Sequence, residues 1–153
     1  RVVALVVRRS SGNSEADRRS AWREWVREKS WTELEQSLGV SGLERLTVIR
    51  RSSSGRVVGL TAVSASGTTR EWTGFEVRQA LQLPETLFSM HLRTAADGAR
   101  WVRFLGRGWG HGVGLCQNGA YGLARSGMEF EAILKHYYSG MSVVRWPAEP
   151  GVK

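Results

Sequence analysis

The chain has a single cysteine, Cys116, among its 153 residues. One cysteine excludes an internal disulfide and any metal site built from cysteines alone. The longest apolar run, residues 2–7, is far shorter than the ~20 residues that a membrane-spanning helix needs, so no transmembrane segment is predicted. No signal peptide is visible, and the chain starts at Arg1 inside a strand-like run. This start suggests a piece of a longer or processed protein.

Lysine is also scarce, and arginine provides all but three of the 22 cationic residues, in a chain with a formal net charge of +8. The planar guanidinium group suits carboxylates and phosphates and stacks on rings. The basic charge therefore indicates a polyanionic partner, such as nucleic acid, an anionic membrane or an acidic cell-wall polymer. Alternatively, it reflects an arginine-rich genome and a solvated surface. No nucleic-acid recognition motif is present, so specific nucleic-acid binding is not expected.

The apolar patterning predicts one α+β domain over residues 1–153, with mixed, mainly antiparallel strands, several short helices, and a glycine-rich loop that leads into a helix pair. Ser30 with Glu33, and Thr73 with Glu76, have the capping-box form that starts a helix. Strands are expected over 2–9, 45–51, 56–65, 68–73, 87–94, 99–106 and 141–146, and helices over 17–29, 30–39, 75–83, 114–126 and 129–138.

Glycine occupies every second position of GRGWGHGVG, residues 106–114. Glycine is costly to order in helices and strands, so this spacing indicates a close backbone approach. If the segment is extended, Arg107, Trp109, His111 and Val113 share one face and glycine hydrogens form the other. If it is looped, the glycines permit left-handed turns. In both arrangements a ligand-binding loop is favoured over a purely structural crossing.

Residues 106–140, GRGWGHGVGLCQNGAYGLARSGMEFEAILKHYYSG, resemble the signature of the SpoIID/LytB family, the sporulation stage II protein D proteins and their amidase-enhancer relatives. The preceding segment FEVRQALQLPETLFSM, residues 75–90, resembles the same family, with Arg78, Leu81 and Phe88 at matching places. Weaker similarity in SGRVVGL and SWTELEQSLGV extends the resemblance over nearly the whole chain.

This resemblance implies binding and cleavage of peptidoglycan glycan strands outside the cytoplasm, at the cell wall or envelope. In a spore former, the location would be the space between forespore and mother cell. SpoIID proteins are lytic transglycosylases that act on glycan whose stem peptides have been removed. Such an enzyme needs one carboxylic acid, which protonates the leaving oxygen and then takes a proton from the C6 hydroxyl of the sugar to close an anhydro ring. No cofactor is implied.

The catalytic acid of the family is a glutamate in an upstream motif resembling LPLEEYVxGVVxxEMP, and this chain has no such motif. Glu129 and Glu131 fit a helix start, and no positive argument supports Glu85. The chain is therefore expected to be the C-terminal portion of a longer family member and to be inactive alone. Its catalytic residue is unknown and would lie on an N-terminal portion or a separate polypeptide. The alternative is a non-catalytic wall-binding or amidase-enhancer module with a cell-wall amidase as partner.

Three substrate-binding candidates lie on the glycine-rich segment. Trp109 either stacks on a sugar or packs in the core beneath the loop. His111 takes a polar role in the site, binds a metal with Cys116, or serves as a hydrogen-bonded structural residue. Two ligands five positions apart fall short of a zinc pattern, so no metal is predicted. Arg107 would pair with a carboxylate of the substrate or of the catalytic acid.

Two further candidates, Gln117 and Tyr121, are four residues apart on the predicted helix and so share a face. With His111 they would line a groove. Cys116 is expected to pack as a small apolar residue at the start of this helix. Arg78 either belongs to the site, as the resemblance implies, or forms a buried ion pair.

Overall fold

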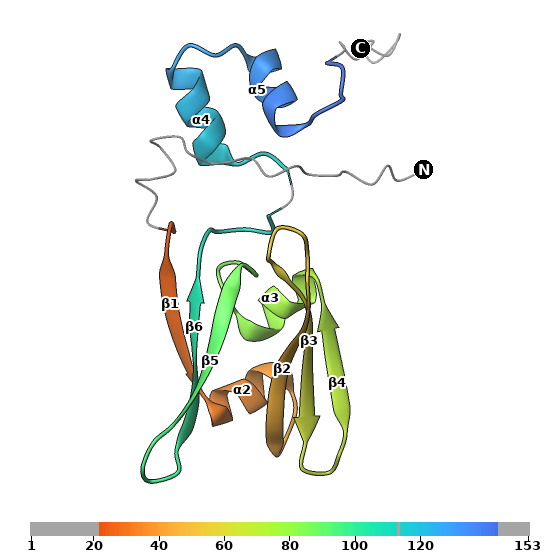
Figure 1. Ribbon diagram of the computed structural model, residues 1–153, viewed down its shortest axis with the longest axis vertical. Coiled ribbons are helices and arrows are strands. Elements are labelled where there is room, and N and C mark those ends of the chain that lie inside the picture. The colour runs from red at the N-terminus through yellow and green to blue at the C-terminus, as the bar shows by residue number, and fades with distance from the viewer. Residues whose placement is uncertain (1–21, 113, 144–153) are drawn as a thin grey trace, which may run out of the picture. The chain divides into compact units, whose positions relative to one another are not determined.

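The computed structural model describes residues 22–112 and 114–143, which fall into two compact units at the same boundary. The strands lie in the 22–112 unit and a pair of helices in the 114–143 unit (Figure 1). The elements in chain order are β1 (Trp25–Ser30), α2 (Trp31–Leu38), β2 (Leu43–Arg51), β3 (Val57–Ser64), β4 (Thr69–Thr73), α3 (Phe75–Leu81), β5 (Phe88–Thr94), β6 (Arg100–Gly106), α4 (Gln117–Arg125) and α5 (Phe130–Tyr137).

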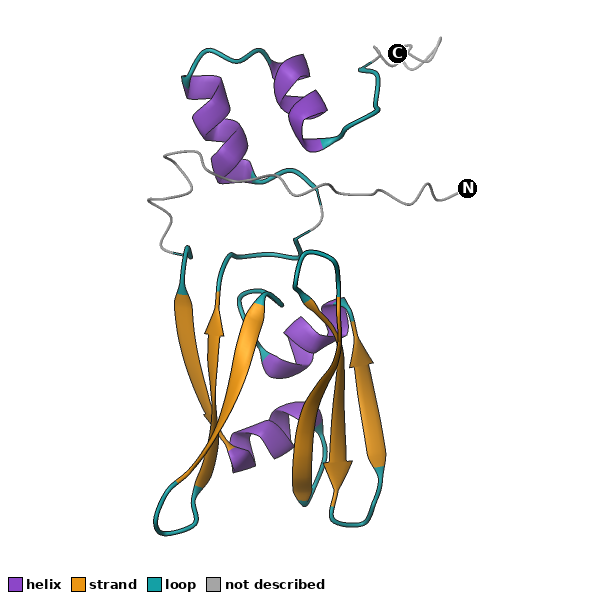
Figure 2. Ribbon diagram, viewed as in Figure 1, coloured by secondary structure: helices purple, strands orange, loops and turns teal. Residues whose placement is uncertain are grey.

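Two antiparallel three-stranded sheets form the 22–112 unit, with strand orders β1-β6-β5 and β2-β3-β4. Helices α2 and α3 lie between the sheets (Figure 2). Helix α2 contacts β1, β2 and β6, and α3 contacts β3 and β4. The expected α+β class with mainly antiparallel strands is confirmed.

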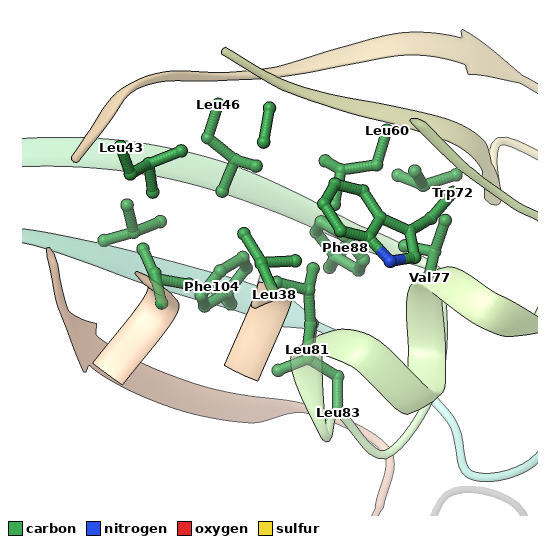
Figure 3. Packing of buried hydrophobic residues seen from close by; sticks show 14 of the residues in the cluster. Leu38, Leu43, Leu46, Leu60, Trp72, Val77, Leu81, Leu83, Phe88 and Phe104 are labelled. Carbon is green, nitrogen blue, oxygen red and sulfur yellow. The ribbon is translucent and has the colours of Figure 1, made fainter. Parts of the chain in front are cut away.

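Apolar side chains from both sheets and both helices meet in one core (Figure 3). Phe88 of β5 and Phe104 of β6 pack edge to face, with ring centroids 5.5 Å apart. Leu34 and Leu38 of α2 are almost fully buried, and burial of a leucine side chain contributes about 1.5–3 kcal/mol. Each short helix is therefore held by its buried face rather than by its intrinsic propensity.

Helix α2 begins and ends where the sequence predicts. The Ser30 hydroxyl accepts the Glu33 N–H, and the Glu33 carboxylate accepts the Ser30 N–H, so the capping box is complete. Gly39 ends the helix in the left-handed region at φ 61°. At α3, the Glu76 carboxylate accepts the N–H and the hydroxyl of Thr73, although the N-cap residue itself is Gly74.

The helix expected over 17–29 is wrong where the structure describes it, because 25–29 belong to strand β1. The strand lies at the edge of its sheet and pairs with β6, with Trp25 opposite Gly106. Within β1 only Trp25 is buried. The exposed charged residues of this segment are compatible with a helix as well as with a strand. Pairing with β6 decides the conformation, as tertiary context often overrides helical spacing.

The other expected elements differ in outcome. The β5–β6 hairpin turns at Asp97-Gly98 as predicted, with the Asp97 carboxylate accepting the Ala99 N–H. Helices α4 and α5 are also confirmed, separated by a turn at Gly127. Residues 141–143 form no strand. The expected strand over 2–9 lies outside the described residues.

The two carboxylate-capped helix starts make stability sensitive to acid. Hydrogen bonds from the backbone and side chain of Ser30 lower the pKa of Glu33. Those from the backbone and side chain of Thr73 lower the pKa of Glu76 in the same way. A carboxyl group whose pKa is lowered by folding adds stability above its unfolded pKa, near 4.5. That stability is lost as the pH falls through the folded pKa.

We therefore expect the Tm of the Glu33→Gln/Glu76→Gln double variant to fall less than that of the wild type as the pH is lowered from about 7 to about 3. Thermal unfolding followed by circular dichroism measures the difference. Glu71→Gln removes an exposed carboxylate outside both capping arrangements and should follow the wild type. Parallel curves for the wild type and the double variant would contradict the assignment.

Candidate functional site

The glycine-rich loop, defined here as residues 106–112, begins at the last residue of β6 and is not extended after it. Gly108, Gly110 and Gly112 all have positive φ, at 84°, 119° and 68°. A side chain is strained at such φ values, because its Cβ approaches the neighbouring carbonyl oxygen. The looped arrangement is therefore the one that the structure supports, and the alternating glycines serve backbone conformation.

Gly106 has a different role, because it ends β6 without positive φ. A Cβ at this position would lie 2.1 Å from the Cζ2 atom of Trp25. The buried Trp25 ring therefore occupies the space that any side chain at position 106 would need. Its Nε1 donates a hydrogen bond to the Gly108 carbonyl at 3.0 Å. The Gly108 N–H donates to the Trp22 carbonyl at 2.7 Å, so residues 22–25 hold one side of the loop.

The segment between α3 and β5 holds the other side. Arg107 donates its N–H to the Leu87 carbonyl, and Gly110 donates its N–H to the Pro84 carbonyl, both at 3.0 Å. Residues 83–86 of this segment are buried. Backbone hydrogen bonds from two separate segments thus fix the path of the loop.

A buried carboxylate, that of Glu85, lies beneath the loop. Glu85 is 1% exposed, and its Oε1 accepts the Thr86 N–H at 2.7 Å and the Thr86 hydroxyl at 3.1 Å. The same oxygen lies 3.4 Å from the Arg56 Nε. A Cβ on Gly108 would lie 3.7 Å from the Glu85 Cγ, and one on Gly112 would lie 1.9 Å from the Arg56 Nε. The Glu85–Arg56 pair therefore supports the loop from below.

Sequence reasoning offers no positive argument for Glu85. The available signal was a carboxylate within the largely apolar run LQLPETLF. Such a residue is buried only when it is paired or hydrogen-bonded. The partner, Arg56, lies 29 positions earlier in the chain, and only the packing of the sheets reveals it.

Trp109 projects from the loop into a partly exposed cluster, which we call the stacking surface (Trp22, Phe75, Arg78 and Trp109). Trp109 is 58% exposed, which excludes the alternative of a core tryptophan. Its ring centroid lies 4.3 Å from that of Trp22, and the ring planes are tilted by 41°. The Arg78 guanidinium lies 5.5 Å from the Trp109 ring and 5.6 Å from the half-exposed Phe75 ring.

Arg78 is held in place rather than buried in an ion pair. Its Nε donates to the Pro84 carbonyl at 3.0 Å, the same carbonyl that accepts the Gly110 N–H. A cation over an aromatic face contributes about 0.5–1 kcal/mol at exposed sites. The stacking surface therefore combines flat apolar faces with a positioned positive charge.

Arg107 pairs with a carboxylate of this chain. Its guanidinium lies 3.2 Å from the Glu24 Oε1, and both side chains are mostly exposed. An exposed pair of this kind contributes about 0–1 kcal/mol. Its pairing with a substrate or a catalytic carboxylate stays a prediction.

The remaining candidates are exposed residues of both units. His111 lies on the loop, and Gln117 and Tyr121 lie one turn apart on α4. A groove that combines all three stays a prediction.

The packing expected for Cys116 is wrong, because the residue is exposed. It is the N-cap of α4, and its sulfur accepts the Gly119 N–H at 3.5 Å, since the first N–H groups of a helix need outside acceptors.

The chain is similar to two curated proteins. It is 27% identical to stage II sporulation protein D of Bacillus amyloliquefaciens over 113 residues, which cover 72% of this chain and 30% of that protein. It is 54% identical to an uncharacterized protein of Brachyspira hyodysenteriae over 39 residues, 26% of this chain and 11% of that protein. The chain thus spans less than a third of either relative.

None of the helices described within 22–112 and 114–143 has the length and hydropathy of a membrane-spanning segment. Residues 2–114, which include every strand described here, match one family. The chain belongs to this family, described as Domain of unknown function (DUF8618).

Proposed function

We propose that this chain binds peptidoglycan glycan strands as part of a lytic transglycosylase of the SpoIID type. The observation that carries the proposal is the exposed ring of Trp109, which lies beside the Arg78 guanidinium. Trp109 belongs to a loop whose backbone is held by hydrogen bonds from two separate segments. Sugar rings present C–H groups that pack on aromatic faces. A guanidinium group can pair with the lactyl carboxylates of the same polymer.

Similarity to stage II sporulation protein D supports a role in sporulation. The resemblance of residues 106–140 to the SpoIID/LytB signature adds the cell wall and an extracytoplasmic location to the proposal. Under this proposal the sequence 106–140 is the SpoIID/LytB signature, and residues 1–153 are the C-terminal portion of a longer family member. The substrate-binding residues are the loop residues and α4 residues identified above: Arg107, Trp109, His111, Gln117 and Tyr121.

The acid that cleaves the glycan lies outside this chain in the proposal. Two described carboxylates lie close to the glycine-rich loop. Glu85 is buried and engaged by Thr86 and Arg56, and Glu24 is paired with Arg107. This engagement of both carboxylates also fits a second candidate function, a wall-binding or amidase-enhancer module that retains glycan without cutting it.

The two candidates differ in the chain ends that they produce. Peptide-stripped glycan incubated with the full-length precursor should acquire 1,6-anhydromuramyl ends if the protein is a lytic transglycosylase, and mass spectrometry identifies them. Ordinary reducing ends would indicate hydrolysis. Retention of glycan with no new ends would favour the non-catalytic module.

Trp109→Ala is expected to weaken binding to peptide-stripped glycan roughly tenfold, because the largest exposed aromatic face of the stacking surface is removed. Co-sedimentation with purified glycan measures the change. Phe130→Ala is the matched control, since it removes an aromatic side chain that is 63% exposed on α5, outside the stacking surface. Equal binding by the two variants would contradict the proposed role of the loop.

A further inference from the structure

A concave surface lies on the 22–112 unit, between the end of α2, strand β4 and helix α3. This open hollow has a volume of about 470 Å³, within the roughly 300–1,000 Å³ range of small-molecule sites. The polar and aromatic side chains that line it are Gln36, Ser37, Arg70, Trp72, Glu76 and Gln79.

The exposed face of α3 connects the hollow to the stacking surface. At 3.6 residues per turn, the order around this face is Arg78, Phe75, Gln79 and Glu76. Arg78 lies against the Trp109 ring at one side, and Gln79 and Glu76 line the hollow at the other. Side chains three or four positions apart on a helix have Cβ atoms about 5–6 Å apart. One continuous surface therefore links two places where a ring could bind.

The hollow is built around a fixed arginine. An Arg70 Nη donates to the Leu38 carbonyl at 2.9 Å, and its guanidinium lies 5.2 Å from the centre of the Trp72 ring. Gly39 leaves room for it, since a Cβ there would lie 3.1 Å from the same nitrogen. The backbone carbonyl and the ring thus hold Arg70 before any ligand arrives.

The chemistry of the lining favours an uncharged sugar. The amides of Gln36 and Gln79 both donate and accept hydrogen bonds, as hydroxyl and N-acetyl groups require. The positive charge of Arg70 is matched by the negative charge of Glu76, so the hollow carries no net charge from these two groups. A phosphate site would instead concentrate donors and positive charge.

We propose that this hollow is a second glycan subsite, which binds an uncharged, hydroxylated or N-acetylated sugar of a strand whose neighbouring units lie on the stacking surface. The inference rests on the proposed glycan function and extends it, because it predicts that affinity grows with the length of the glycan. A strand long enough to follow α3 reaches both places, whereas a disaccharide occupies only the stacking surface, where Trp109 offers the more exposed ring.

The test compares peptide-free glycan fragments of two and six sugars, binding to the 153-residue chain by isothermal titration calorimetry. The wild type should bind the hexasaccharide more tightly than the disaccharide. The Gln36→Ala/Gln79→Ala double variant should bind the hexasaccharide about tenfold more weakly, the loss expected for two ordinary hydrogen bonds. Its affinity for the disaccharide should be unchanged. Glu71→Gln is the control, because Glu71 points to the other face of β4 from Arg70 and Trp72.

Binding by Trp109→Ala distinguishes two outcomes: that the hollow is not a subsite, and that the chain does not bind glycan at all. If Trp109→Ala weakens binding of both fragments but the double variant binds the hexasaccharide as the wild type does, the hollow is not a subsite. If the wild type binds neither fragment, the proposed glycan function fails, and the subsite fails with it. Thermal unfolding of each variant confirms that the fold is retained.

Discussion

Replacing Glu85 by alanine is expected to lower the free energy of unfolding by about 3 kcal/mol. The Glu85 carboxylate is buried beneath the glycine-rich loop, where Oε1 accepts two hydrogen bonds from Thr86 and lies 3.4 Å from the Arg56 Nε. Its removal leaves the buried Thr86 N–H without its acceptor and the Arg56 guanidinium without its ion-pair partner. The Arg56 side chain remains 25% exposed. The Nε that faces Glu85 is buried, but partial access of water to the rest of the Arg56 side chain places the loss at the lower end of the ~3–5 kcal/mol typical of broken buried pairs.

Urea denaturation measures this loss, and two variants identify its cause. Glu85→Gln keeps the shape and one acceptor oxygen, so its effect should lie between those of the wild type and the alanine variant. Glu24→Ala breaks the exposed pair with Arg107 beside the same loop and should cost no more than about 1 kcal/mol. Similar losses for Glu24→Ala and Glu85→Ala would show that Glu85 does not support the loop.

Gly106→Ala is expected to cost about 3 kcal/mol, the upper part of the range for overpacking a core. The added Cβ would lie 2.1 Å from the Cζ2 atom of Trp25 and 2.4 Å from two further ring atoms. The ring cannot move away freely, because Trp25 is 5% exposed and its Nε1 donates to the Gly108 carbonyl. Urea denaturation reports the loss.

A double-mutant cycle assigns this cost to the contact with Trp25. In a Trp25→Leu background the large ring is absent, so Gly106→Ala should cost markedly less than it does in the wild type. The difference between the two backgrounds is the coupling energy of the pair. An identical cost in both backgrounds would contradict the packing argument and would indicate a backbone effect at position 106.

The sequence predicted the features that depend on near neighbours. The Ser30–Glu33 capping box and the Asp97-Gly98 turn involve residues at most three positions apart, and the structure contains both. The error at β1 has the opposite cause. The spacing of Trp22, Trp25 and Val26 is helical, but strand pairing of Val26 with Leu105 determines the conformation, and that partner lies 79 positions away in the chain.

The candidate site also combines residues that the sequence indicated with residues that only the structure revealed. The residues of the glycine-rich loop stood out in the sequence, because alternating glycines around Arg107, Trp109 and His111 are unusual. Arg78 was a candidate through the family resemblance alone. Trp22 and the Glu85–Arg56 pair were not predicted to lie at the loop, since they come from other parts of the chain. The exposure of Trp109 likewise depends on which segments hold the loop.

By itself, the amino-acid sequence determined the α+β class, the helix caps and hairpin, and the position of the loop. Those features follow from hydrophobic spacing and from hydrogen bonds between residues close in the chain. Only the tertiary structure decided that residues 25–29 are a strand, that Glu85 is buried under the loop and that Trp109 is exposed beside Arg78. Burial and pairing depend on contacts between residues distant in the chain, and those contacts cannot be predicted from the local sequence.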